Sequence, residues 1–318
     1  MELRKLGESD IQVSTLTVGC WSFGGGTGSY WGHQSQQAVN ELVAEALDLG
    51  VNFFDTAFGY NDGDSERALG TALKGKRDKA LICNKIPIQQ TDDLGKYEQT
   101  ITASLNRLQT DVIDVMMIHW PTRDEGLLRA NLEALQHVQE KGLVRAIGVS
   151  NFAVRTLEIA REMGIAVIVN EFAYNLMSRG MEQDVLPYCR DMNIGVAAYM
   201  PLMQGILTGK YATLEDIPLK RKRTVHFDSR CNPESRHGGP GAEDAIHYLL
   251  RELRQLADES GISAAHLSIG WILAKEGVST VIAGCRSVEQ LRDNVKAAMA
   301  SLDPAVLQAL DEASRPLF

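Results

Sequence analysis

The sequence has few cysteines, and they are not arranged for a disulfide framework or a metal site. The five cysteines are scattered, odd in number and form no CxxC pair. No cysteine or histidine cluster has the spacing of metal ligands. We therefore expect free thiols, as in a reducing compartment such as the cytoplasm, and we predict no metal site.

The sequence also lacks a long apolar run and an excess of basic residues. No stretch approaches the length that crosses a bilayer, and residues 1–5 are not followed by an apolar signal segment. The formal net charge is −9 at pH 7, which argues against a general affinity for nucleic acid or for anionic membranes. These absences predict a soluble, cytoplasmic protein with neither nucleic acid nor a membrane as its partner, and they indicate no oligomeric state.

What the sequence does contain is a repeated alternation of short apolar runs and amphipathic segments. Two short runs around residues 7–10 predict a hairpin. Eight further runs predict strands, at residues 16–18, 52–54, 81–84, 112–118, 146–149, 166–169, 195–198 and 278–282. Helical periodicity is found at residues 36–49, 65–73, 96–108, 126–139, 154–162, 184–190, 244–259, 264–275, 288–298 and 304–313. This alternation predicts a parallel sheet closed into a (β/α)₈ TIM barrel, as one α/β domain over residues 1–318.

Two long loops separate the predicted elements. An open doubly wound sheet, the alternative fold, would need a GxGxxG turn directly after the first strand. The glycines of residues 24–28 lack that spacing, so we interpret them as a loop over the barrel mouth. Residues 203–241 form a second loop that contains the basic run of residues 220–223. So long a loop in a compact barrel is commonly functional. The run is either a solvated surface or a flap that holds a phosphate-bearing ligand.

Ionisable side chains stand at the ends of three consecutive predicted strands. Asp55 follows the second strand, with Tyr60 in the loop after it, while Lys85 ends the third strand and His119 the fourth. Active sites of such barrels are built from the carboxyl ends of strands that lie about 4.8 Å apart, so we expect the four to lie together. Taken singly, each has a plainer interpretation: Asp55 could cap a helix, and Lys85 could be a surface lysine.

These four side chains fit proton transfer to a carbonyl oxygen. A phenol has a pKa of about 10 in water, and a nearby ammonium is expected to lower the pKa of Tyr60 while Asp55 keeps Lys85 charged. His119 can donate or relay a proton and can bind a substrate oxygen. No nucleophilic serine or cysteine motif is visible. Since side chains cannot supply a hydride, we predict a nicotinamide cofactor as its source.

The sequence resembles the aldo-keto reductases over nearly its whole length. The resemblance is carried by the motifs Asp55-Thr56-Ala57-x-x-Tyr60, Lys85, Ile118-His119-Trp120-Pro121, Gly148-Val149-Ser150-Asn151-Phe152, Tyr199-x-Pro201-Leu202, and Ile282-x-Gly284-x-Arg286 with Asn294. It implies that Tyr60 is the general acid, that Lys85 and Asp55 tune its pKa, and that His119 orients the substrate or relays a proton. It also implies NADPH/NADP⁺, or less often NADH, bound extended across the barrel mouth without a Rossmann fold.

The remaining motif positions are expected to bind the cofactor. Ser150 and Asn151 end the fifth predicted strand, where they could hydrogen-bond the nicotinamide carboxamide, and Tyr199 could stack on the ring. Arg286, at a helix start, suits an adenosine 2′-phosphate; its plainer interpretation is a surface arginine. The full expected set comprises Ser150, Asn151, Glu171, Tyr199, Pro201, Leu202, Gly284, Arg286, Gln290 and Asn294.

Three positions depart from the family pattern. Glu171 stands where glutamine is common, and an ionised carboxylate cannot donate to the carboxamide. Met200 replaces a common serine, which removes a polar contact near the pyrophosphate, and Cys285 replaces a small residue.

Four aromatic residues are expected to line the substrate pocket: Trp21, Trp120, Tyr30 and Trp31. Aromatic walls suit flat carbonyl compounds and also stack on sugar faces, so we expect a small carbonyl or sugar substrate. The predicted function is reduction of aldehydes and ketones, or oxidation of alcohols or aldoses in reverse. The alternatives are a non-catalytic regulatory barrel that binds the cofactor and a metal-dependent barrel hydrolase, whose ligand motif is missing.

Overall fold

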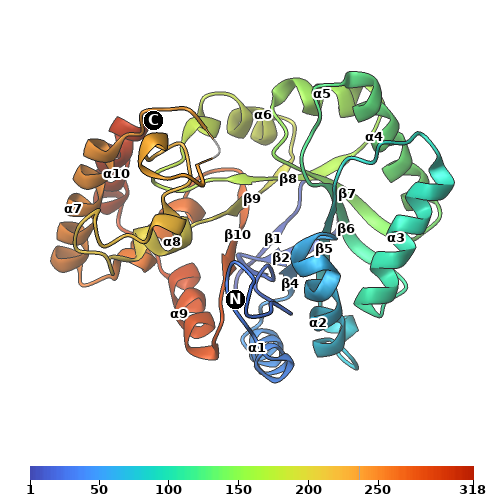
Figure 1. Ribbon diagram of the computed structural model, residues 1–318, viewed down its shortest axis with the longest axis horizontal. Coiled ribbons are helices and arrows are strands. Elements are labelled where there is room, and N and C mark those ends of the chain that lie inside the picture. The colour runs from blue at the N-terminus through green and yellow to red at the C-terminus, as the bar shows by residue number, and fades with distance from the viewer. Residues whose placement is uncertain (236) are drawn as a thin grey trace.

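A closed parallel barrel is the centre of the molecule. The computed structural model describes residues 1–235 and 237–318. Within these residues eight parallel strands close in the order β10-β3-β4-β5-β6-β7-β8-β9 (Figure 1). They are β3 (Leu16–Gly19), β4 (Phe53–Asp55), β5 (Leu81–Ile86), β6 (Ile113–Ile118), β7 (Val144–Ser150), β8 (Val167–Ala173), β9 (Gly195–Tyr199) and β10 (Val278–Gly284). The prediction of a TIM barrel is confirmed.

Ten α-helices in the described residues surround this barrel (Figure 1). They are α1 (Gln36–Asp48), α2 (Asp64–Ala72), α3 (Leu94–Leu108), α4 (Glu125–Glu140), α5 (Val154–Glu162), α6 (Val185–Asp191), α7 (Glu243–Ser260), α8 (Ala264–Leu273), α9 (Val288–Met299) and α10 (Pro304–Ser314). Several begin at a capping side chain: Ser35, Asp93 and Asp124 each accept a hydrogen bond from the first turn that follows. None of the described helices combines the length and the apolar character that crossing a membrane requires.

Short 3₁₀ turns connect several of these elements. They are η1 (Tyr60–Gly63), η2 (Arg77–Lys79), η3 (Gly180–Glu182), η4 (Met203–Thr208), η5 (Leu219–Arg221), η6 (Ser229–Cys231) and η7 (Arg315–Leu317). Two of them, η1 and η4, follow the carboxyl ends of β4 and β9 and begin the loops that carry candidate site residues.

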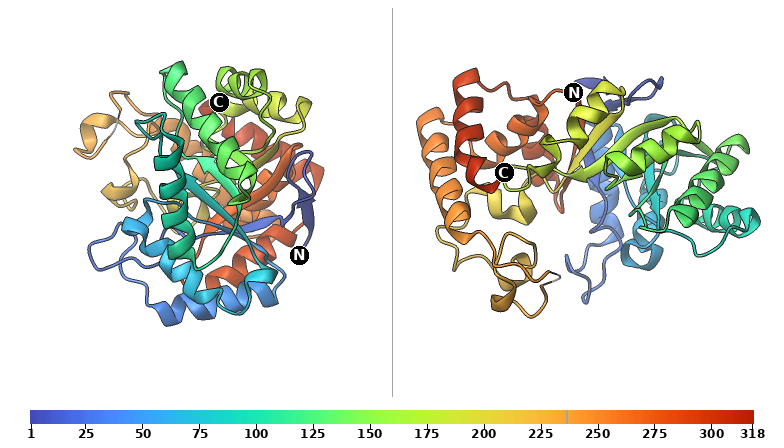
Figure 2. Two further views of the ribbon diagram at one scale, coloured as in Figure 1. Left: turned by 90° about the vertical axis from the view of Figure 1, so that its right-hand side faces the viewer. Right: turned by 90° about the horizontal axis from the view of Figure 1, so that it is seen from above.

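The predicted hairpin closes the amino end of the barrel. Strands β1 (Leu3–Lys5) and β2 (Gln12–Ser14) pair antiparallel, and Leu6, Ile11 and Val13 are buried in the same apolar cluster as the barrel interior. Gly7, at φ +54°, makes this possible because a Cβ there would stand 2.6 Å from the Asn193 carbonyl oxygen. The long loops lie at the opposite end of the barrel (Figure 2).

The barrel interior sets which residues reach the carboxyl end. Its apolar cluster includes Phe53, Cys83, Met117, Val169, Ala197 and Ile282, one from each of six strands. Alternate residues of a strand face the same side. The residues two positions later therefore also face the axis, at the mouth: Asp55, Lys85, His119, Glu171, Tyr199 and Gly284.

Several strands run further toward the mouth than their apolar pattern predicts. The fifth and sixth barrel strands reach Ser150 and Ala173, and β5 reaches Ile86, so that Lys85 lies inside its strand rather than after it. The parallel pairing continues because backbone groups still pair there, with Lys85 beside Met117 and Glu171 beside Ser150. A change to polar side chains at the mouth therefore hides the strand ends from a hydrophobicity pattern.

Candidate active site

Lys85 is the centre of the predicted site. Its side chain is fully buried and its ammonium contacts an Asp55 carboxylate oxygen. The same ammonium lies 3.3 Å from Glu171 Oε1 and donates to the Thr56 carbonyl oxygen at 3.2 Å. Burial by itself would lower the pKa of Lys85, but the two carboxylates outweigh it and raise the pKa well above its ordinary value. Lys85 is therefore a fixed positive charge.

Glu171 approaches this charge from the other side of the barrel mouth. The residue is 3 % exposed, and its second oxygen, Oε2, has no hydrogen-bond partner among the described residues. Burial, together with the Asp55 charge, raises the pKa of Glu171 to about 8, although Lys85 acts in the opposite direction. We expected Glu171 only at the cofactor. The structure also makes it a second carboxylate on Lys85.

Tyr60 stands at the rim above Lys85. The Lys85 Nζ lies 5.4 Å from the centre of the Tyr60 ring. The next residue, Asn61, has φ 50°. Its Nδ2 donates to the carbonyl oxygens of Trp21 and Phe23, which links the Tyr60 turn to the loop that follows β3, called the first loop below. The four predicted catalytic side chains are thus brought to one place.

Lys85 acts on the pKa of Tyr60 in the expected direction, but the net shift is upward and not downward as predicted. Burial raises the pKa of Tyr60 well above its ordinary value, and the charges of Asp55 and Glu171 add to the rise, while Lys85 only partly offsets it. Desolvation is the largest cause because the buried phenol would lose the water that stabilises its phenolate. Tyr60 is therefore a neutral phenol at physiological pH and can donate its proton.

His119 lies beside Tyr60 and is uncharged. The two ring centres are 5.7 Å apart, with the planes near perpendicular at 74°. Burial, followed by the charge of Lys85, lowers the pKa of His119 to about 3. A neutral imidazole carries a single N–H. Of the two candidate proton donors, His119 is thus suited to holding a substrate oxygen and Tyr60 to giving up a proton.

Aromatic rings surround this pair. Trp21 stacks on Tyr60 at 5.9 Å and on Tyr30 at 5.4 Å, and Trp31 meets the Trp21 edge at 5.6 Å. On the far side Trp120 lies 6.3 Å from His119 and is 57 % exposed. Of the four predicted substrate residues, Trp21 and Trp120 therefore border the Tyr60–His119 pair, while Tyr30 and Trp31 pack on Trp21.

The first loop is fastened to the long loop after β9, and this contact was not predicted. The Tyr30 hydroxyl lies 2.6 Å from Gln204 Oε1 and 2.8 Å from the Lys220 carbonyl oxygen. The Arg221 guanidinium lies 4.3 Å from the centre of the Trp31 ring. The two loops run side by side in Figure 2. The basic run of residues 220–223 was the only sequence signal for this contact, and no pattern pointed to Gln204.

The side chains predicted to bind nicotinamide form one hydrogen-bonded group at the ends of β7 and β9. Tyr199 donates to Asn151 Oδ1 at 2.8 Å, and Asn151 Nδ2 donates to the His119 carbonyl oxygen and to Ser150 Oγ. The Asn151 N–H donates to the Glu171 carbonyl oxygen at 2.7 Å. Pro201 and Leu202 continue from Tyr199 into the turn at η4.

Backbone strain is concentrated at this mouth. Of the eight non-glycine residues with positive φ among those described, six follow barrel strands at the carboxyl end: Asn61, Asp62, Asn151, Met200, Met203 and Gln204. Each such residue costs about 1–3 kcal/mol and is kept only where the surroundings impose it. Such strain is typical of a functional site.

The residues predicted to bind the adenosine end lie one strand further along. Strand β10 pairs with β9, with Ile282 beside Tyr199, and exposed Gly284 ends it. Arg286 is exposed and donates through Nη2 to the His33 carbonyl oxygen at 2.7 Å, while its backbone N–H donates to Gln290 Oε1. Asn294 is buried on the same helix, α9. The predicted cofactor residues thus follow the rim from β7 to α9, and Glu171 is the member of the set that also contacts Lys85.

This donor set fits an extended nicotinamide dinucleotide. An unpartnered buried carboxyl oxygen on Glu171 and a phenol on Tyr199 stand at one end. An exposed guanidinium on Arg286 and the start of α9 stand at the other, where an anion is favoured. The residues of this set come from strand ends and α9, so the expected cofactor site does not depend on a Rossmann turn.

Three side chains near Lys85 lie close enough together to resemble a metal site. One ligand atom each of Asp55, Cys83 and Glu171 lies within 4.8 Å of the others, as in a small metal site. The Lys85 ammonium contacts both carboxylates there, and burial raises the pKa of the Cys83 thiol well above its ordinary value, which makes it a poor ligand.

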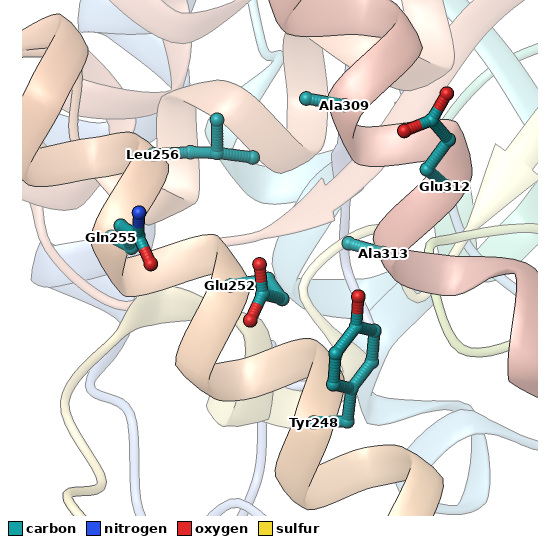
Figure 3. A pocket seen from close by; sticks show the side chains of 7 residues that line it. All are labelled: Tyr248, Glu252, Gln255, Leu256, Ala309, Glu312 and Ala313. Carbon is teal, nitrogen blue, oxygen red and sulfur yellow. The ribbon is translucent and has the colours of Figure 1, made fainter.

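A pocket of about 110 Å³ lies outside the barrel between α7 and α10 (Figure 3). It is lined by Tyr248, Glu252, Gln255, Leu256, Ala309, Glu312 and Ala313, none of which belongs to the predicted set.

Comparison with known proteins identifies the family. The profile of the Aldo/keto reductase family matches residues 15–315. Aldo-keto reductase YhdN of Bacillus subtilis is 30 % identical over 301 residues, covering 92 % of this chain and 87 % of that one. The NADH-specific methylglyoxal reductase of Escherichia coli is 28 % identical over 332 residues, covering 98 % of each. A solved aldo-keto reductase from Klebsiella pneumoniae, in complex with NADPH, has a TM-score of 0.75 at 25 % identity, covering 98 % of this chain and 95 % of that one.

The chain belongs to the aldo/keto reductase family. It is therefore an oxidoreductase that acts on carbonyl compounds, and the expected reaction class is confirmed.

Proposed function

We propose that this aldo/keto reductase uses NADP(H) to reduce aldehydes and ketones to alcohols, with Tyr60 as the proton donor. The same site would oxidise alcohols or aldoses in reverse. The observation that carries the proposal is the geometry: the Tyr60 and His119 rings lie 5.7 Å apart, and Tyr60 lies over the buried Lys85 ammonium. Burial favours a protonated phenol and a neutral imidazole there. A carbonyl oxygen between Tyr60 and His119 could accept a hydrogen bond from the His119 N–H and take the proton of the Tyr60 hydroxyl.

Each catalytic side chain then has a separate task. His119 donates its N–H to the carbonyl oxygen, and Tyr60 transfers its proton to that oxygen as negative charge develops there. Lys85 stabilises the phenolate that Tyr60 leaves behind, and Asp55 holds Lys85 in place. The reduced nicotinamide, when bound, supplies the hydride.

The residues along the rim would hold the cofactor. Ser150, Asn151 and Glu171 would bind the carboxamide, and Tyr199 would pack on the ring. Arg286 supports a preference for NADPH, because a guanidinium binds a 2′-phosphate with paired hydrogen bonds. The Klebsiella relative binds NADPH, whereas the Escherichia coli relative is named NADH-specific. The preference is therefore to be measured with both cofactors.

The aromatic walls support a small carbonyl substrate. Trp21 and Trp120 offer flat apolar faces next to the reacting pair, suited to an aromatic aldehyde, a small dicarbonyl or a sugar face. The relative named for methylglyoxal makes a small dicarbonyl the first compound to test.

The substitution Tyr60→Phe tests the proposal. It keeps the ring that stacks on Trp21 and removes only the proton donor. Turnover of 4-nitrobenzaldehyde and methylglyoxal, followed by NADPH oxidation, should fall by about 10²- to 10⁴-fold. The Kd for NADPH, from fluorescence titration, should change less than about twofold, because no cofactor contact is lost.

Tyr248→Phe is the matched control, since this tyrosine lies on α7 away from the barrel mouth. It should behave as the wild type in both assays. Full turnover by Tyr60→Phe would show that another group gives the proton. Tight NADPH binding by the wild type without turnover of any compound in a broad carbonyl panel would instead favour the regulatory barrel.

A further inference from the structure

The proposed function gives Glu171 a contact with the cofactor but does not explain why a second carboxyl group lies against Lys85. Strand β8 fixes it by pairing with β7 and β9, Glu171 lying beside Ser150 and Ala197. Its Oε1 lies 3.3 Å from Lys85 Nζ, yet its Oε2 is buried with no hydrogen-bond partner among the described residues. A buried carboxylate oxygen left without a donor is costly, so the protonation state of Glu171 needs an account.

A count of charges supplies this account. Asp55 and Glu171 share one ammonium, and their side chains and that of Lys85 are at most 4 % exposed. Two ionised acids would leave a buried net charge of −1, whereas one retained proton leaves the group neutral. Asp55 is in closer contact with Lys85 than Glu171 is, so Glu171 is the acid that gains less from being ionised.

No other neighbour compensates for the second acid. The titratable groups that face Glu171 are Asp55 on β4, Tyr60 on η1, Cys83 and Lys85 on β5, and Tyr199 on β9. Burial raises the pKa values of the thiol and both phenols, so these three are neutral, and His119 beyond them is neutral too. Lys85 is thus the only cation among the described residues that face Glu171.

We propose that Glu171 is a positioning residue that keeps the proton of the Asp55–Lys85–Glu171 group and meets the cofactor as a neutral carboxylic acid. The cofactor half of this inference rests on the proposed function. A neutral acid has one O–H donor and one acceptor oxygen, and it can therefore serve both groups of a carboxamide, as a glutamine side chain would. The pKa of Glu171, raised to about 8, agrees with this state at neutral pH.

The first test needs no cofactor. Equilibrium unfolding in urea is measured for the wild type and for Glu171→Gln between pH 5 and pH 10. A folded-state pKa above the unfolded value means that the stability due to this group is complete below the unfolded pKa and is lost as pH rises to the folded pKa. The wild-type unfolding constant should therefore rise relative to that of Glu171→Gln by about tenfold per pH unit, and level off above about pH 8.

The second test follows binding of NADPH and NADH over the same pH range. The wild-type Kd should increase as pH passes about 8, while the Kd of Glu171→Gln should show no such step, because an amide does not ionise. Asp114→Asn is the control. Asp114 is also buried, on β6, but pairs with Arg77 at 2.6 Å at the start of the strand, so its loss should leave the wild-type step in place.

A direct measurement covers the case in which Glu171→Gln does not fold. In wild-type protein carrying ¹³C-labelled glutamate carboxyls, one buried resonance should titrate near pH 8. Titration of every glutamate below about pH 6, or unfolding curves whose ratio does not change with pH, would overturn the proposal. A Kd step that persists in Glu171→Gln would overturn its cofactor half. If neither nicotinamide cofactor binds at any pH, the proposed function fails, yet the unfolding and ¹³C measurements still decide where the proton lies.

Discussion

The substitution Lys85→Met removes the one cation of the centre while keeping most of the side-chain volume. Lys85 contacts Asp55 and lies 3.3 Å from Glu171, and all three side chains are nearly inaccessible to water. Methionine would leave the two acids facing each other in a site that cannot solvate them. The response of the folded state must therefore be either loss of stability or uptake of protons.

The size of the effect follows from the burial of the pair. Removing one partner of a buried ion pair costs about 3–5 kcal/mol, which is a large part of the total of about 5–15 kcal/mol typical of a folded protein. Without the ammonium, Glu171 loses the charge that lowers its pKa, so its folded-state pKa should rise further above the unfolded one. The stabilising contribution of Glu171 is then present at low pH and is lost as pH rises, with a slope of about 1.4 kcal/mol per pH unit. The cost of Lys85→Met should thus be larger at pH 8 than at pH 5.

Urea unfolding followed by tryptophan fluorescence measures this cost for the wild type, Lys85→Met and the double variant Lys85→Met/Glu171→Gln. The double variant should recover about 1–3 kcal/mol at pH 8, because only one buried acid remains unpaired. A loss below about 1 kcal/mol, or one that is equal at pH 5 and pH 8, would refute the charge count at this centre. Turnover should also fall in Lys85→Met, since the phenolate of Tyr60 loses its counter-charge.

Two further predictions concern the rim. Arg286→Ala should raise KM for NADPH by about 10- to 100-fold while changing KM for NADH less than about threefold, because only NADPH has a 2′-phosphate that a guanidinium can bind. Equal effects on the two KM values in steady-state assays would count against this role. Tyr30→Phe removes the hydroxyl that lies 2.6 Å from Gln204 Oε1 and should loosen the contact between the two long loops. We expect KM for 4-nitrobenzaldehyde to rise about fivefold, in line with a loss of about 1 kcal/mol, with kcat changed less than about twofold; an unchanged KM would mean that the loop contact does not shape the substrate pocket.

The sequence predicted the barrel and the members of its centre, for one physical reason. Strands of a parallel barrel are buried on both faces and appear as apolar runs, so the runs can be found from hydrophobicity, and Asp55, Lys85 and His119 each follow such a run directly. The period of two then brings them to the axis. What the pattern could not supply is distance across the barrel. Glu171 was placed at the cofactor from its motif position, but its contact with Lys85 depends on the barrel radius, which no local pattern encodes.

The sign of the Tyr60 pKa shift shows a second limit of the same kind. A lysine on the neighbouring strand suggests an acidified phenol, but the net pKa shift depends on how many charges are buried together and how little water reaches them. The loop contact between Tyr30 and Gln204 was missed for a related reason: it joins residues 174 positions apart, in segments without periodicity. Pairings of that kind are set by where the barrel places the loop ends.

The retained proton on Glu171 bears on how Tyr60 can act at all. Burial makes Tyr60 a weak acid. The surrounding charges must therefore keep the free-energy cost of forming its phenolate low. With Glu171 neutral, Asp55 and Lys85 balance, and the phenolate is the first net charge to appear in the group. With Glu171 ionised it would be the second, and the two like charges would repel each other in a site that little water reaches. Each increment of about 1.4 kcal/mol in that repulsion would slow the reaction about tenfold. A carboxylate at position 171 is therefore compatible with proton donation by Tyr60 only while it holds its proton, which connects the one residue that departs from the family pattern at this centre to the pH range in which the enzyme can work.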